Sequence, residues 1–140
     1  MPPIQSPSSL DVSVVVPVHG GAAALEALRE RLAATLGARG LRHELILVDD
    51  RGHEASWRVI RALAARHPEV RGLRLGRNFG QHAATVCGIA EARGAWVVTM
   101  DDDLEHPPEC VPQLLEAGDE AHPLVYGVFR QRTHGRYRNA

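Results

Sequence analysis

The stretch "DVSVVVPV", residues 11–18, contains five valines and no charged side chain after its first residue. A continuous β-branched run of this kind is typical of a strand whose two faces are both buried. Strands buried on both faces occur in sheets that are covered by helices on each side. The segment therefore indicates an α/β fold.

Strand and helix patterns alternate along the chain from residue 11 onward. Leucines at 25, 28, 32 and 36 recur at helical spacing after the first predicted strand. We expect strands at 11–18, 43–50, 70–76, 95–101 and 123–129, and helices at 22–40, 55–68, 81–94 and 108–117. Such alternation with short connections predicts three layers, in which a mostly parallel, Rossmann-like sheet has helices on both faces.

The length and charge of the chain exclude several classes of function. At 140 residues it is long enough to bury the core of one domain. The formal net charge of −1 argues against general binding to polyanions, so we expect no nucleic-acid partner. All sixteen basic residues are arginines, which excludes a Schiff-base lysine and a G-x-x-x-x-G-K-[ST] phosphate loop.

The ends and the thiols of the chain indicate a cytoplasmic domain. Residues 1–10, "MPPIQSPSSL", lack the regions of a signal peptide and predict a disordered lead-in. No run approaches the roughly 20 apolar residues of a transmembrane segment, so we expect none in this chain. Cys87 and Cys110 have no C-x-x-C spacing and predict reduced thiols of an intracellular protein.

Polar residues follow the predicted strands at the points where the strands end. In an open parallel sheet, ligands bind at the carboxyl ends of the strands. Four segments occupy such positions: "PVHG" (17–20), "DDRG" (49–52), "RNFG" (77–80) and "DDDLE" (101–105). We therefore expect two acidic clusters and an arginine along one edge of the sheet.

Three consecutive aspartates, residues 101–103, repel one another unless a cation lies close by. Asp101 and Asp103 can direct both carboxylates to one point, and Glu105 can add a third. Oxygen ligands of this kind suit Mg²⁺ or Mn²⁺, which would also hold a diphosphate. The middle residue, Asp102, is expected to turn away from this point. The alternative is that the aspartates cap the following helix and turn the chain.

The other strand ends carry groups that suit a nucleotide. A carboxylate of Asp49 or Asp50 can accept hydrogen bonds from a ribose hydroxyl or a base N–H, and Arg77 can pair with a phosphate or a base. A solvated turn and a surface arginine are the alternatives. The segment "HGGAAAL" does not match G-x-G-x-x-G, so we do not expect a dinucleotide.

The last twelve residues, "FRQRTHGRYRNA", carry four arginines. They can contact an anionic lipid surface or an acceptor phosphate. A solvated chain end is the alternative.

Four segments of the chain resemble one known family. These are "SVVVPVHG" (13–20), "ELILVDDRG" (44–52), "LGRNFGQHAATVCGIAEARGAWVVTMDDDLEHPPE" (75–109) and "LVYGVFRQR" (124–132). Together they resemble family-2 glycosyltransferases of the GT-A fold. The most similar branch transfers a sugar from a nucleotide-sugar to a polyprenyl phosphate such as dolichol or undecaprenyl phosphate.

The resemblance assigns roles to individual residues. In the family, the turn after the first strand and the V-D-D acids hold the nucleoside, and the arginine of the R-N segment lies beside the nucleotide. The matching residues here are Pro17, Asp49, Asp50 and Arg77. The D-x-D pair, Asp101 and Asp103, is implied to be catalytic by binding the metal and the diphosphate, with Asp101 also beside the nucleotide. Glu105 stands where the family usually has a glutamine and is expected to join the metal ligands.

The sequence departs from the family pattern at several points. His19 and Gly20 replace an Asn-Glu pair, and "DDRGHEAS" (49–56) replaces D-D-G-S-x-D. Family catalytic domains also continue well beyond this length. The resemblance therefore implies a GT-A nucleotide-binding domain over residues 11–140 that is incomplete at its C-terminus.

The implied function is inverting, metal-dependent transfer of a sugar from a UDP-sugar to a polyprenyl phosphate. The reaction would take place in the cytoplasm at the inner face of the membrane, with membrane contact and homo-oligomerisation left open. A first alternative is a non-catalytic nucleotide-binding fragment of this lineage. A second is a D-x-D phosphatase or phosphotransferase of the haloacid-dehalogenase type, which is disfavoured because its motif normally follows the first strand and needs a downstream lysine.

Overall fold

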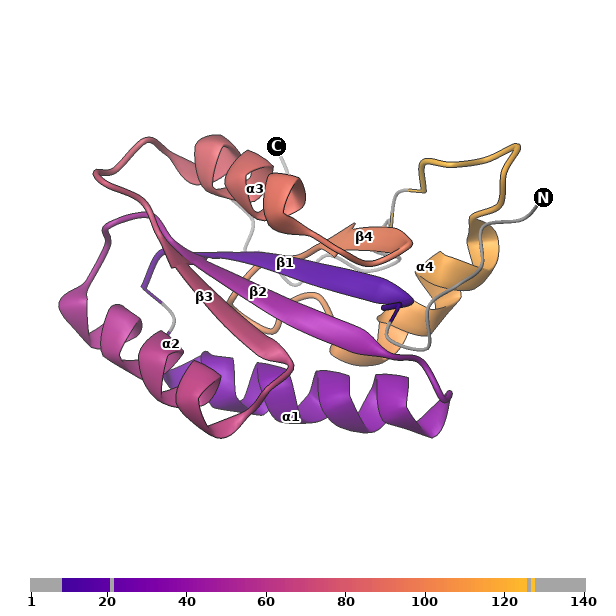
Figure 1. Ribbon diagram of the computed structural model, residues 1–140, viewed down its shortest axis with the longest axis horizontal. Helices are drawn as coiled ribbons and strands as arrows, with labels where there is room; N and C mark the ends of the chain where they lie inside the picture. The colour runs from indigo at the N-terminus through magenta and orange to yellow at the C-terminus, as the bar shows by residue number, and fades with distance from the viewer. Residues whose placement is uncertain (1–8, 21, 126, 128–140) are drawn as a thin grey trace, which may run out of the picture.

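The computed structural model of the chain describes residues 9–20, 22–125 and 127. Four strands form one parallel sheet: β1 (Val12–Val18), β2 (His43–Asp49), β3 (Val70–Arg74) and β4 (Trp96–Thr99). Their order across the sheet is β3-β2-β1-β4 (Figure 1). All seven residues of β1 are buried, because β1 lies between β2 and β4 and is covered on both faces. The predicted α/β fold is therefore confirmed.

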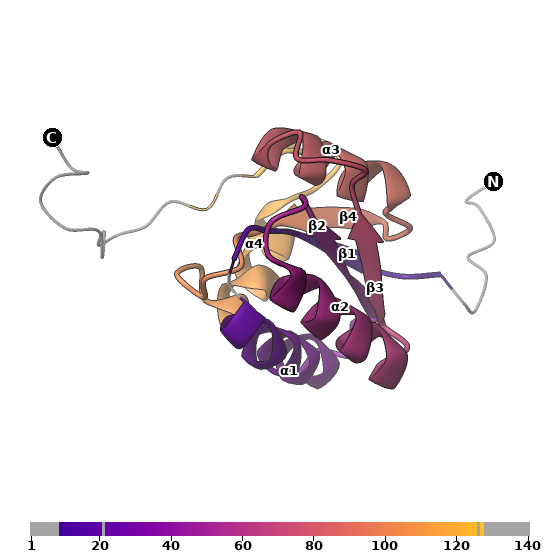
Figure 2. The ribbon, with the colours of Figure 1, turned by 90° about the vertical axis from the view of Figure 1, so that its left-hand side faces the viewer.

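Helices cover the two faces of the sheet, so the domain has three layers (Figure 2). The helices α1 (Ala22–Ala38) and α2 (Glu54–Arg66) lie on one face. The short 3₁₀ turn η1 (Pro108–Cys110) and α4 (Val111–Ala117) also pack on that side. The helix α3 (Gln81–Glu91) lies on the other face, against β1 and β2.

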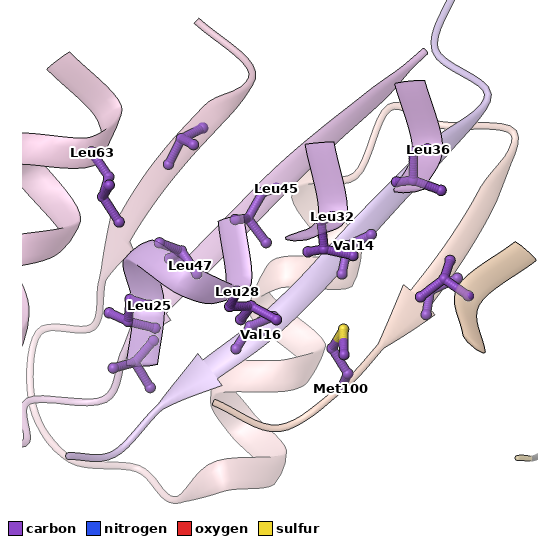
Figure 3. Close-up of a cluster of buried hydrophobic side chains, with 14 of the residues drawn as sticks. Val14, Val16, Leu25, Leu28, Leu32, Leu36, Leu45, Leu47, Leu63 and Met100 are labelled. Carbon is purple, nitrogen blue, oxygen red and sulfur yellow. The ribbon is translucent and has the colours of Figure 1, made fainter. Parts of the chain in front are cut away.

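The main core forms where α1 meets the sheet (Figure 3). The four leucines that the helical spacing singles out are all fully buried: Leu25, Leu28, Leu32 and Leu36. They meet side chains of β1 and β2 and the residue that follows β4: Val14, Val16, Leu45, Leu47 and Met100. Burying one leucine contributes about 1.5–3 kcal/mol, so this stripe fixes α1 on the sheet.

A second, smaller core lies under α3. Val15, Ile46 and Val48 of the sheet meet Ala84 of α3. A Cβ atom on Gly88 would lie 2.3 Å from Cγ1 of Val15, so only glycine lets the helix approach β1 this closely.

The strand order reverses between β1 and β4. The strands β1, β2 and β3 follow one another toward one side of the sheet, whereas β4 lies on the other side of β1. The pairing of β1 with β4 ends where the Val15 carbonyl accepts the Met100 N–H. The backbone of Pro17 faces β4, as that of Val15 does. Because proline has no N–H, Pro17 cannot donate a further hydrogen bond to β4. The ends of β1 and β4 are therefore no longer paired at the carboxyl edge of the sheet.

Two sequence predictions for the second half of the chain are wrong. The residues of 123–129 that the structure describes, 123–125 and 127, form no strand, and the rest of that range lies outside the described residues. A strand needs a pairing partner and a buried face, and Leu124 is 69% exposed. The helix predicted over 81–94 ends at Glu91, because the Arg93 and Gly94 N–H groups instead donate to Ser13 Oγ at 3.2 and 2.8 Å.

The predictions for the two chain ends fall largely outside the described residues. These are the lead-in, apart from residues 9 and 10, and the arginine-rich tail. In the part of the chain that the structure describes, no helix has both the length and the apolar character needed to cross a bilayer.

Candidate functional site

The polar segments that the sequence singles out lie along the carboxyl edge of the sheet. Residues 17–20 end β1, 49–52 end β2, 77–80 follow β3 and 101–105 follow β4. In open parallel sheets, ligands bind outside this edge, in the crevice where the strand order reverses. Here that point lies between the ends of β1 and β4.

Asp102 joins the two sides of this switch point. Its Oδ2 atom accepts a hydrogen bond from the backbone N–H of His19 at 3.0 Å. His19 directly follows β1, and Asp102 lies three residues after β4. The carboxylate of Asp102 therefore faces the β1 loop, and its orientation relative to a cation at Asp101 and Asp103 stays a prediction.

Asp101 is held from the side of α3. Its Oδ1 atom accepts a hydrogen bond at 3.1 Å from the side-chain amide of Gln81, the first residue of α3. The start of α3, which directly follows the segment that contains Arg77, is therefore joined to the acidic segment after β4.

The acidic segment ends in a tight turn. Oδ1 of Asp103 accepts the backbone N–H of Glu105 at 3.0 Å. Leu104, between them, has a φ of 62°, in the left-handed region that residues other than glycine rarely adopt. Its side chain packs against the main core, which holds the turn in this conformation. Asp103 and Glu105 are exposed at the turn.

The donor set of this segment suits a hard divalent cation that shares its shell with a ligand. Among the described residues, no three His, Cys, Asp or Glu side chains are arranged to hold a metal ion by themselves. Mg²⁺ and Mn²⁺ do not require such a group, because one or two carboxylates, water and substrate phosphates complete their shells. The hydrogen bonds to Asp101 and Asp103 use Oδ1 of each carboxylate. An ionised carboxylate has further lone pairs, so Asp101 and Asp103 could still be ligands of a cation.

Asp49 is fully buried at the end of β2. Its Oδ2 atom forms an ion pair with Nε of Arg74 at 3.1 Å, without the alignment of a hydrogen bond. Its Oδ1 atom accepts a long hydrogen bond of 3.4 Å from the Gly52 N–H. Arg74 also binds Glu54 at 2.6 Å, and this hydrogen bond lowers the pKa of Glu54.

Asp50 is 1% exposed and binds the backbone of the loop 77–80. Its Oδ1 atom accepts the Phe79 N–H at 2.9 Å, and its Oδ2 atom accepts the Gly80 N–H at 3.0 Å. Gly80 caps α3 with a φ of 97°, a conformation that side chains oppose. Both acids of the V-D-D segment therefore have intramolecular partners, and their contact with a nucleoside stays a prediction.

Arg77 lies on the exposed side of the same loop. Its guanidinium carbon is 4.6 Å from the centroid of the Phe79 ring, and Phe79 is 54% exposed. A guanidinium that stacks through its face keeps its in-plane N–H groups for a phosphate or a base.

The loops after β1 and β2 are packed against each other. A Cβ atom on Gly52 would lie 2.6 Å from the carbonyl oxygen of His19, so only glycine fits there. A Cβ atom on Gly20 would lie 3.4 Å from the His53 ring. Gly20 and Gly52 thus allow the two loops to pack closely against each other.

The far end of the acidic loop is fixed to α1. The Arg31 guanidinium donates to both carboxylate oxygens of Glu109, at 2.7 and 2.6 Å. These hydrogen bonds lower the pKa of Glu109 and raise that of Arg31. The last residue of the D-x-D-L-x-x-P-P-E segment therefore anchors the loop.

Two open hollows lie at the other edge of the sheet. The larger, about 460 Å³, is lined by Asp11 and Trp96 at the amino ends of β1 and β4 and by Arg39 and Glu116. The other, about 440 Å³, lies beside Trp96 and Asp119. Neither touches the carboxyl edge, so we assign neither to the candidate site.

Two further residues of this edge contact predicted site aspartates and are not predicted as site residues. Gln81 and Arg74 each bind a predicted site aspartate, although their sequence positions mark them only as helix and strand residues. The Gln81 contact has a signal in the sequence, because Gln81 directly follows "RNFG". The Arg74 contact has none, because it depends on β3 pairing with β2.

The fold and the placement of these groups define a Rossmann-like α/β protein with a candidate ligand site at its switch point. The chain matches the family model for glycosyl transferase family 2 over residues 13–140 and belongs to this family.

Several curated relatives share one name. The chain is 40% identical over 128 residues to the undecaprenyl-phosphate 4-deoxy-4-formamido-L-arabinose transferase of Aeromonas hydrophila, covering 91% of this chain and 39% of the relative. It is 34% identical over 130 residues to the protein of the same name from Klebsiella pneumoniae, covering 92% of this chain and 40% of the relative. The chain thus spans about two fifths of the length of these relatives.

Solved structures share the fold. The mannosyltransferase PcManGT from Pyrobaculum calidifontis, in complex with GDP-Man and Mn²⁺, aligns with a TM-score of 0.61 at 22% identity. The alignment covers 73% of this chain and 30% of PcManGT. S. aureus TarS 1–349, in complex with UDP-GlcNAc, aligns with a TM-score of 0.58 at 21% identity over 67% of this chain and 27% of TarS. These neighbours confirm the predicted GT-A fold.

Proposed function

We propose that this chain is the nucleotide-sugar-binding part of an inverting glycosyltransferase. The donor in this proposal is a UDP-sugar, and the acceptor is a polyprenyl phosphate at the cytoplasmic face of the membrane. Membership of glycosyl transferase family 2 and the names of the relatives support the reaction type and the acceptor. The nucleotide-sugars bound by the structural neighbours support the donor class.

The observation that carries the proposal is the position of the acidic segment. Asp102 binds the β1 loop, and Asp101 binds the first residue of α3, so the segment lies at the switch point beside the loop of Arg77. A diphosphate bound at this point would contact a cation that the carboxylates hold. The guanidinium of Arg77 could pair with the same diphosphate.

The proposed contacts divide into two sets. The nucleotide would be bound at Pro17, Asp49, Arg77 and Asp101, and Asp50 would belong to the same site. The divalent cation, Mg²⁺ or Mn²⁺, would be held by one or two of the carboxylates of Asp101, Asp103 and Glu105, with water and phosphate oxygens completing its shell. When bound, the cation would supply positive charge against the charge that builds up on the leaving diphosphate. Asp101 and Asp103 are the proposed catalytic residues because they place that charge.

The acceptor in this proposal needs no general base. A phosphate monoester has a second pKa of about 6 and is largely ionised at pH 7. The described residues therefore only have to position the donor with its anomeric carbon open to the acceptor. Holding donor and acceptor together in a reactive geometry can supply about 7–11 kcal/mol.

Calorimetric titration tests the donor site. UDP-glucose, UDP alone and GDP-mannose would each be titrated into the chain with Mn²⁺ and with EDTA. We expect metal-dependent binding with a preference for the uridine nucleotides. If none of the three binds under either condition, the assignment of the donor site is wrong.

The second candidate function is nucleotide binding without transfer. It is favoured by the departures of His19, Gly20 and the segment 49–56 from the family pattern. Radiolabel transfer from a UDP-sugar to undecaprenyl phosphate distinguishes the two candidates. In the proposal, the chain alone binds the donor and transfers weakly or not at all, whereas a longer protein that contains it transfers.

A further inference from the structure

We propose that Asp50 is a positioning residue of the donor site. Its buried carboxylate fixes the loop 77–80 and thereby orients Arg77 and Gln81 toward the ligand. The inference rests on the proposed function for the identity of that ligand. In this role Asp50 acts on the ligand indirectly, by positioning other residues.

The contacts of Asp50 use its whole carboxylate. One oxygen accepts the Phe79 N–H at 2.9 Å, and the other accepts the Gly80 N–H at 3.0 Å. Because Asp50 is only 1% exposed, these two amides replace the water that would otherwise solvate its carboxylate. A buried carboxylate requires such donors, and bonds from N–H groups to a charged acceptor are stronger than neutral ones.

The loop that Asp50 holds would not keep this shape by local preference alone. Gly80 has a φ of 97°, and its N–H has one other acceptor, Oδ1 of Asn78, at 3.1 Å. Fixing each backbone residue costs about 1–2 kcal/mol of conformational entropy. The two bonds to a rigid strand end offset part of this cost and set where α3 begins.

Two site residues depend on this starting point. Gln81, next to Gly80, binds Asp101 at 3.1 Å, and Arg77 stacks on Phe79 at 4.6 Å. A shift of the loop would move the Gln81 amide away from Asp101 and the Arg77 guanidinium away from the diphosphate. The end of β2 is thus connected to the acidic segment after β4 through the first turn of α3.

A direct contact between Asp50 and the nucleotide makes a different prediction. Direct contacts by two separate residues contribute independently, so their losses multiply in affinity. A residue that acts only through Arg77 and Gln81 has no further effect once both of these side chains are removed. A cycle of Asp50→Asn with the double variant Arg77→Ala/Gln81→Ala therefore distinguishes the two roles.

The first measurement uses the free protein. Amide hydrogen exchange in Asp50→Asn should be faster at Phe79 and Gly80 and unchanged at Val15 in β1. The exposed Asp119→Asn is the matched control and should change neither. If Asp50→Asn does not fold, exchange in the unsubstituted protein decides: Phe79 and Gly80 should be more protected than Asn78. Equal protection, or unchanged exchange in Asp50→Asn, overturns the proposal.

The second measurement is nucleotide affinity with UDP and Mn²⁺. Asp50→Asn and Arg77→Ala should each weaken binding about tenfold, which corresponds to about 1.4 kcal/mol. Adding Asp50→Asn to Arg77→Ala/Gln81→Ala should change the affinity by no more than about twofold, because residues that act through one another are not additive. A further loss of about tenfold on adding Asp50→Asn would overturn the positioning role. If the unsubstituted protein binds no UDP, the proposed function fails, and the exchange measurement still decides the role of Asp50 in the loop.

Discussion

Oδ2 of Asp102 lies 3.0 Å from the backbone nitrogen of His19, and this hydrogen bond connects the loops after β4 and β1 across the switch point of the sheet. All three aspartates of the triplet have intramolecular partners, and Asp102 is the one whose partner here lies in the β1 loop. This bond contributes to holding the β1 loop beside the acidic segment.

Asp102→Ala should weaken nucleotide binding without unfolding the domain. Losing one hydrogen bond of this kind costs about 0.5–1.5 kcal/mol, because water replaces the carboxylate at a partly exposed site. Asp102→Asn is the matched control, since its side-chain oxygen can still accept the His19 N–H. Urea unfolding and UDP titration of both variants check this. Equal affinity loss in the two variants would show that the charge of Asp102 matters and not the bond.

Gly52→Ala should destabilise the domain and disturb the β1 loop. The new Cβ atom would lie 2.6 Å from the carbonyl oxygen of His19, so one of the two loops must move. Overpacking of this kind costs about 1–3 kcal/mol. Gly76→Ala is the control, because nothing lies within 4 Å of its Cβ position. Thermal unfolding should show a lower Tm for Gly52→Ala only, and a similar Tm for both variants would contradict the close contact between the loops.

The stability of the domain should fall in acid through Glu44. This residue is 3% exposed; burial opposes its ionisation, but hydrogen bonds from Ser13, the Arg93 N–H and Arg71 outweigh burial and lower its pKa. A carboxyl whose folded pKa is lowered stabilises the fold above its ordinary value of 4.5. That contribution is lost as the pH falls from about 4.5 through the folded pKa.

Urea unfolding between pH 7 and pH 3 measures this contribution. Glu44→Gln should lower the free energy of unfolding at pH 7 and make it less dependent on pH below 4.5. Glu30→Gln, at an exposed position of α1, is the control and should keep the pH dependence of the unsubstituted protein. An unchanged slope in Glu44→Gln would contradict the account of its hydrogen bonds.

Much of the fold could be predicted because hydrophobic periodicity decides it. The valines of β1 and the leucines of α1 are buried as their spacing predicts. The strand predicted over 123–129 is wrong because periodicity does not show whether an apolar run finds a pairing partner, and Leu124 stays exposed. The end of α3 could not be predicted because it depends on residues far away in the sequence. Ser13 of β1 and Glu44 of β2 bind the N–H groups that follow Glu91.

The candidate site could be predicted only in outline. Strand ends meet at one edge of any parallel sheet, so the acidic segment and Arg77 could be placed together. The order β3-β2-β1-β4 is needed to see that Asp102 reaches His19 and that Arg74 reaches Asp49. Contacts between neighbouring strands depend on this order, which the sequence pattern does not contain.

Calorimetry of UDP with Mn²⁺ measures whether the proposed donor site depends on a metal ion. The unsubstituted chain should bind UDP in Mn²⁺ and lose about tenfold or more in affinity with EDTA. Asp101→Asn and Asp103→Asn should lower the affinity in Mn²⁺ to the level measured with EDTA. Asp119→Asn, an exposed aspartate outside the site, should bind as the unsubstituted chain does. Equal affinity with Mn²⁺ and with EDTA, unaffected by either substitution, would contradict the account.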